Sequence, residues 1–224
     1  MMSPPSGQQT RSSCSKIPHA IRRWTISVES SRRRYHQEPS SIDTTVNITR
    51  RWINSFVVDL NLCPFARREV MRNSLRFTVF EDSEPENILH ALSEEITLLH
   101  NSQDIETSFL ILPAGMPDFR DFNDFLYTAQ SLTEALGWEG IYQLVGFHPQ
   151  YQFSDTEPDD AENYTNRSPF PMLHILRESS VSDAVATTQD AALIPERNIT
   201  TLSALGTTAL KARWRSCFTD PPAT

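Results

Sequence analysis

Long apolar runs are absent from this chain of 224 residues, and cysteine is scarce. No stretch approaches the roughly 20 apolar residues that a membrane-spanning helix needs. The N-terminal region also has no apolar core of the kind found in secretory signal peptides. We therefore predict a soluble protein that does not cross a membrane. Cys14, Cys63 and Cys217 are odd in number and far apart, so a disulfide framework is not expected.

Glycine is also scarce, with six residues in the whole chain. The sequence contains neither the glycine-rich loop that cradles nucleotide phosphates nor the dinucleotide-binding fingerprint. A nucleotide cofactor is therefore not indicated. The cofactor, if the protein has one, is unknown from the sequence.

Acidic residues dominate most of the chain, although its first part is basic. Residues 1–40 contain seven Lys and Arg residues against two Glu, a net charge of +5. Since the total is −8, the remaining residues carry −13. An acidic surface repels the phosphates of nucleic acids and of anionic lipids. We expect no nucleic-acid partner and no membrane partner.

The basic leader is rich in Ser and Arg, and apolar residues at helical spacing could form a short amphipathic stretch. This composition is typical of an organellar transit peptide, and its Arg content favours a mitochondrial location over a plastid. The alternatives are a disordered basic tail and a cytoplasmic protein. We predict a disordered leader at residues 1–43, one globular domain at 44–210 and a C-terminal tail at 211–224.

Alternating periodicities predict an α/β layered domain with a short, mostly parallel or mixed sheet. Helices are expected at 44–60, after a Ser83-x-x-Glu86 capping box, and from Asp118 to a stop at Gly137. Strands are expected at 76–80, 107–112 and 141–147. A long irregular loop and C-terminal helices near 171–178, 181–187 and 196–205 would follow. If the strands at 107–112 and 141–147 are parallel neighbours, their carboxyl ends share one edge of the sheet.

Polar and aromatic residues accumulate between positions 147 and 178, where a purely structural segment would repeat apolar ones. The titratable and amide side chains there are His148, Asn163, Asn166, Arg167, His174, Arg177 and Glu178. Tyr151 and several prolines lie among them. This segment is the best candidate for a functional site.

Residues from about Trp52 to Gly206 resemble the family known as domain of unknown function 1415. The resemblance is carried by the sequences LCPFA at 62–66, FHPxYxF at 147–153 and NYTNRSPxPMxHxLRE at 163–178. The family has no established reaction, so the resemblance implies no catalytic residue.

An anion pocket is the first hypothesis for the segment. Arg167 and Arg177 could hold a carboxylate or phosphate, because guanidinium groups match these planar anions. Asn163, Asn166 and Tyr151 would add neutral hydrogen bonds to the same small anionic ligand. Three further residues are candidates for catalysis in a hydrolase or transferase: His148 and His174 as general acid or base, and Cys63 as nucleophile.

A metal site is the second hypothesis. On a helix beginning at Pro171, His174 and Glu178 would lie one turn apart, and His148 could complete the ligand set. The third hypothesis is structural: these side chains satisfy backbone groups of the loop in a non-catalytic binding or assembly protein.

Overall fold

The computed structural model describes residues 40–219, so most of the predicted leader lies outside the described residues. The elements of this part are α1 (Ser41–Trp52), the π-helix η1 (Ile53–Val58), α2 (Ala66–Arg72), β1 (Leu75–Val79), α3 (Pro85–Asn101), β2 (Thr107–Ile111), α4 (Phe119–Ala135), β3 (Tyr142–Phe147), the 3₁₀ helix η2 (Ala161–Thr165), β4 (Met172–Arg177), α5 (Glu178–Thr187), the 3₁₀ helix η3 (Ala191–Leu193), α6 (Ile194–Leu205) and α7 (Thr207–Ser216). The predicted α/β class with C-terminal helices is confirmed. Among the described helices, none has the length and apolar character needed to cross a bilayer.

The sheet has four strands in the order β1-β2-β4-β3. Strand β2 is parallel to β1, whereas β4 is antiparallel to both of its neighbours, β2 and β3. The condition that 107–112 and 141–147 are neighbours does not hold, because β4 lies between them, although β2 and β3 run in the same direction. The sheet is mixed, as one form of the prediction allowed.

Strand β4 occupies residues 172–177 of the segment 171–178, for which a helix was predicted. That prediction was wrong for a physical reason. Met172, Leu173 and Ile175 are all fully buried, because a central strand has a packed layer on each face. A short apolar run of this kind fits a buried strand as well as a helix, and the two hydrogen-bonding neighbours decide the outcome.

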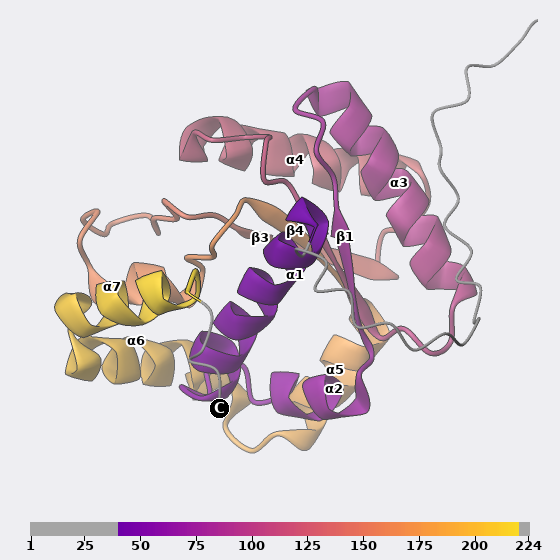
Figure 1. The fold of residues 1–224 in the computed structure, drawn as a ribbon. Helices are drawn as coiled ribbons and strands as arrows, with labels where there is room; N and C mark the ends of the chain where they lie inside the picture. Colours follow the sequence, from indigo (N-terminus) through magenta and orange to yellow (C-terminus); the bar gives the residue numbers. More distant parts are fainter. Residues whose placement is uncertain (1–39, 220–224) are drawn as a thin grey trace, which may run out of the picture. The chain divides into compact units, whose positions relative to one another are not determined.

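Two helical layers cover the two faces of the sheet, as Figure 1 shows. Helices α3 and α4 pack on one face through a core that includes Leu92, Phe122 and Leu144. The opposite face supports a second core, to which α1, η1, α6 and α7 contribute. In this second core, Trp52 and Phe56 are buried together with Leu202 and Leu210. Helix α7 continues past residue 210, where the tail was predicted to begin.

Both ends of α4 lie where the sequence predicted them. The Asp118 side chain accepts hydrogen bonds from the backbone N–H groups of Arg120 and Asp121, which confirms the predicted N-cap of α4. Gly137 follows α4 with a φ of +80°, a conformation that glycine adopts without strain. The capping box at Ser83 was wrong: α3 begins at Pro85, and Asp82 binds the backbone N–H of Glu84 instead.

Candidate functional site

A cavity of about 330 Å³ lies on the face of the sheet that carries the second core. The sheet contributes Phe109, Val145, Phe147, His174 and Leu176 to its wall. The remaining wall comes from α1 and η1, from the segment 63–69, from α5, and from Leu75, Glu106, Thr107 and Arg177. Most of the lining is apolar, and the volume falls at the lower end of the range for small-molecule sites. A second hollow, of about 50 Å³ beside Asn73, is far smaller.

His174 is the central polar residue of this cavity. Its ring stacks on Phe109 with the ring centroids 3.9 Å apart, and its Nε2 lies 2.7 Å from the Thr107 hydroxyl. Thr107 donates its one hydroxyl hydrogen to the carbonyl oxygen of Ile175, at 2.5 Å. Thr107 must therefore accept the Nε2–H of His174, which fixes the tautomer with an unprotonated Nδ1.

The Nδ1 atom of His174 has no hydrogen-bond partner among residues 40–219. Removal from bulk water lowers the pKa of His174 to about 3, because burial disfavours the charged form of a histidine. At neutral pH the ring is uncharged. His174 thus offers a hydrogen-bond acceptor, and not a cation, at the wall of the cavity.

Cys63 lies at the same wall, half-buried and without a disulfide. Burial raises the pKa of its thiol, although hydrogen bonds from the backbone of Phe65 and Ala66 act in the opposite direction. The thiol form therefore predominates at neutral pH, and a raised pKa reduces the reactivity of a cysteine.

Three of the four charged residues at the wall, Arg68, Glu69 and Arg177, have protein partners, whereas the carboxylate of Glu106 makes no hydrogen bond or ion pair within residues 40–219. Arg68 pairs with Glu69 at 2.5 Å. The Nη2 atom of Arg177 donates to the carbonyl oxygens of Leu99, Ser102 and Ile105, at 2.6, 2.8 and 3.2 Å. This guanidinium holds the C-terminal end of α3, where a helix leaves carbonyl oxygens without intrahelical donors.

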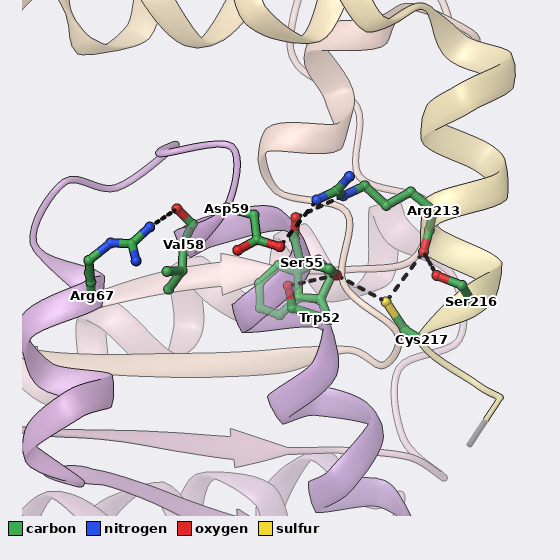
Figure 2. Close-up of polar contacts among 8 residues, drawn as sticks. All are labelled: Trp52, Ser55, Val58, Asp59, Arg67, Arg213, Ser216 and Cys217. Carbon is green, nitrogen blue, oxygen red and sulfur yellow. Dashed lines mark hydrogen bonds and ion pairs between the residues drawn. The ribbon is translucent and has the colours of Figure 1, made fainter. Parts of the chain in front are cut away.

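A π-helical turn shapes the wall that α1 and η1 provide. The backbone N–H of Asp59 donates to Asn54 O, five residues earlier, and π-helical turns of this kind often occur at functional sites. Figure 2 shows the contacts that hold this turn to α7: Arg213 donates to the Ser55 carbonyl oxygen at 2.8 Å, and the Ser55 hydroxyl lies 3.5 Å from Cys217 Sγ. Ile53 and Val57, from the same turn, line the cavity.

Trp52 also lines this wall and has a fully buried polar atom that lacks a protein partner within residues 40–219. The side chain is 1% exposed and packs edge-on against Phe147, with ring centroids 5.2 Å apart. Its indole Nε1 is buried and has no hydrogen-bond partner in the described part of the chain. An unsatisfied buried donor costs about 1–3 kcal/mol.

His148 does not lie with His174. Its ring contacts Phe119 and Phe122 of α4, at 5.5 and 5.2 Å, on the other face of the sheet. Nδ1 accepts the backbone N–H of Gln150, and Nε2 donates to Met116 O. Both ring nitrogens are thus used in holding the turn after β3. Burial lowers the pKa of His148.

The loop residues proposed to bind an anion are hydrogen-bonded to the loop itself or to strand β3. Asn163 is fully buried and bonds to Phe153, Thr156 and Glu157. Asn166 donates to Gly146 O. Arg167 donates to the carbonyl oxygens of Tyr151 and Pro158. None of these residues lines the cavity.

The proposed metal ligands are also dispersed. Glu178 begins α5, and because residues 172–177 form a strand, it is not one helical turn from His174. No group of three His, Cys, Asp or Glu residues within 40–219 could hold a metal ion. Of the residues singled out in the sequence, the cavity wall contains Cys63, His174 and Arg177.

Sequence reasoning missed the aromatic part of this site. Trp52 and Phe109 were counted as ordinary helix and strand residues, and their apolar patterns show only that they are buried. The single usable signal was Phe147 next to the conspicuous His148. That signal pointed to the correct strand end but to the wrong face of the sheet.

Residues 44–212 match the model of a family described as protein of unknown function (DUF1415). No curated protein is significantly similar to the chain. No solved structure is either.

Proposed function

Because the chain belongs to DUF1415, a family of proteins of unknown function, we propose a function from the geometry of the cavity: residues 40–219 bind a small, mainly apolar molecule there. The observation that carries this proposal is a largely apolar cavity of about 330 Å³ containing an uncharged histidine with a free acceptor atom.

The anionic ligand expected from the sequence has weaker support. Arg68 and Arg177 are the cations at the cavity wall, and both are engaged by protein oxygens. Arg167, Asn163 and Asn166 lie in the loop and bond to the loop or to strand β3. An anion at Arg177 would have to displace existing contacts, and an anion at Arg68 would meet the carboxylates of Glu69 and Glu106.

Filling the cavity tests the proposal. Helix α5 contributes Ala184 to the wall, whereas Ala186 on the same helix is exposed. Indole, a small apolar bicyclic molecule, would be titrated into the full-length protein while ¹H–¹⁵N NMR spectra are recorded. We expect shifts at the amides of Val145, Leu176 and Ala184. The Ala184→Phe variant should lose at least tenfold in indole affinity, and Ala186→Phe should match the wild type. Equal binding by both variants would contradict the proposal.

Chemistry at Cys63 is a second candidate function, since Cys63 and His174 line the same cavity. In this hypothesis Cys63 attacks a bound electrophile and His174 accepts the thiol proton, as in a hydrolase or transferase. The raised pKa of the thiol and the low pKa of His174 both oppose it. Alkylation by iodoacetamide, read by mass spectrometry with Cys63→Ala as control, decides the matter. A catalytic thiol must react faster at pH 7 than free glutathione, and we expect Cys63 to react more slowly.

The basic leader supports a mitochondrial location as part of this proposal. Its support is compositional: residues 1–40 carry a net charge of +5 and are rich in Ser and Arg. A fusion of residues 1–43 to a fluorescent protein should accumulate in mitochondria, and replacing the arginines by Gln should prevent this. A fusion that stays in the cytoplasm would contradict this part of the proposal.

A further inference from the structure

We propose that helix α5 is a movable wall of the cavity, which opens to release the ligand and is held closed by it. This inference rests on the proposed binding function and adds a conformational step to that function. The step requires that α5 is weakly held in the ligand-free protein. It also requires that the ligand supplies the contacts that α5 lacks.

The inward side of α5 faces the cavity instead of a packed core. Ser180, Val181 and Ala184 line the cavity. Ser180 and Val181 precede Ala184 by four and three residues, so all three lie on one side of the helix. No residue of α5 is buried, and neither core of residues 40–219 includes a residue of this helix. The side of α5 that would normally pack against the protein therefore borders the cavity.

Polar contacts hold only the beginning of α5. The backbone N–H of Glu178 donates to Ile141 O at 2.9 Å. Beyond Glu178, α5 makes no hydrogen bond, ion pair or ring contact with another element of residues 40–219. The Thr187 hydroxyl, near the other end, bonds to carbonyl oxygens within α5. The helix is therefore anchored at one end.

Helix α4 has the contacts that α5 lacks. On the opposite face of the sheet, α4 buries Phe122, Phe125 and Ala129 in the first core. The Asp118 side chain caps its N-terminus, whereas no side chain caps α5. Most of the stability of a helix in a protein comes from packing of its apolar face, and segments with few buried apolar contacts open most readily. We therefore expect α5 to open while the rest of the fold stays intact.

A bound ligand would complete the packing of α5. A mainly apolar molecule in the cavity would contact Val181 and Ala184 of the helix, and Phe109 and Leu176 of the sheet. Burial of apolar surface against both walls stabilises the closed helix. A ligand that binds only the closed form shifts the equilibrium towards that form, so binding and closure are coupled.

Hydrogen exchange of the backbone amides of α5 measures its opening, and the experiment uses the full-length protein. Indole at about ten times its dissociation constant should slow this exchange about tenfold, because the helix can open only after the ligand has left. Unchanged exchange of α5 with indole bound would overturn the inference.

Two matched double variants show whether α5 opens separately from the rest. Ser182 and Ala186 are exposed and four residues apart in α5, and Ser131 and Ala135 are exposed and four residues apart in α4. Glycine is unfavourable in a helix, so Ser182→Gly/Ala186→Gly should speed the exchange of α5 amides about tenfold. Ser131→Gly/Ala135→Gly should leave this exchange unchanged. Equal acceleration by both pairs would show that α5 opens only when the whole fold does, and would overturn the inference.

A substitution that extends into the cavity tests the same coupling without a ligand. Ala184→Leu adds apolar atoms on the cavity side of α5, and Ala186→Leu adds the same atoms on the exposed side. Exchange of α5 amides should be at least about twofold slower in Ala184→Leu than in Ala186→Leu. Equal exchange in the two variants would show that contacts across the cavity do not hold the helix.

The outcomes distinguish the inference from the binding function. If indole binds, Ala184→Phe blocks it and α5 exchange does not respond, the binding function stands and the inference fails. If indole slows α5 exchange and the two glycine pairs differ as described, both stand. If indole does not bind and Ala184→Leu exchanges like Ala186→Leu, both fail.

Discussion

Polar side-chain atoms have protein partners in the loop between β3 and β4, but some of them lack partners at the cavity beside His174. In the loop, Asn163, Asn166, Arg167 and His148 all bond to protein groups. At the cavity, His174 Nδ1 and Trp52 Nε1 have no partner among the described residues. A segment rich in polar side chains can thus be a scaffold, whereas a mainly apolar wall can hold polar atoms that have no protein partner. The four predictions below test this contrast, beginning with the largest expected effect.

Asn163→Ala should be the most damaging change. It removes three hydrogen bonds from a fully buried side chain and leaves the partner groups of the loop unpaired. We expect the free energy of unfolding to fall by about 3 kcal/mol, measured by urea denaturation. Asn101→Ala is the matched control, since Asn101 makes one exposed hydrogen bond and its loss should change stability by less than about 0.5 kcal/mol. Similar values for both variants would mean that the loop is not the scaffold described.

Ala129→Leu should destabilise the opposite face of the sheet by about 2 kcal/mol, because overpacking a filled core forces side chains out of their rotamers. Ala129 is fully buried in α4, within the core between that helix and the sheet. Thermal and urea unfolding would measure the change. A neutral result would show that this face also contains unfilled space.

Acidification should weaken the fold through His174. In the unfolded chain a histidine takes up a proton near pH 6.5, but in the folded protein His174 does so only near pH 3. Unfolding therefore binds a proton between these values, and stability falls as the pH drops through this window. In the His174→Phe variant, the plot of the free energy of unfolding against pH should be flatter by up to about 1.4 kcal/mol per pH unit. Denaturation curves at pH 7, 5.5 and 4 would show this, and identical slopes would contradict the assignment.

Ala184→Leu should have the smallest effect on stability, below about 0.5 kcal/mol. The added atoms enter the cavity instead of a packed core, so no side chain has to move. This result and that for Ala129→Leu form a pair, because the same substitution is made on two helices that cover opposite faces. Equal destabilisation at both positions would show that the cavity closes in solution.

Local patterns allowed much of the fold to be predicted. Helix α4 follows from its Asp118 cap, its apolar spacing and the stop at Gly137, and β2 follows from a buried run at 107–112. Strand β4 was mistaken for a helix because Met172, Leu173, Ile175 and Leu176 fit both periods. Only the two neighbouring strands resolve that ambiguity, and pairing between distant segments is not visible in local spacing.

The site was harder to predict than the fold. Cys63 and His174 were named for their chemistry, and the structure places both at the cavity. The cavity itself combines segments near residues 52–69, 106–109, 145–147 and 174–184, which are brought together only by the sheet order. The state of a polar atom, paired or free, also depends on such distant neighbours. This is why Asn163 and His148 looked functional in the sequence.

Strand β4 lies inside the sheet, between β2 and β3, but it is the last of the four strands to be synthesised. On the ribosome, β2 and β3 emerge well before β4, yet each needs β4 as its neighbour. Until residues 172–177 leave the exit tunnel, the nascent chain carries two unpaired strand edges, which are prone to associate with other chains. The sheet can close only late in synthesis, and with it the wall that holds His174. We expect chaperones that shield nascent chains to matter more for this protein than for one whose strands pair in the order of synthesis.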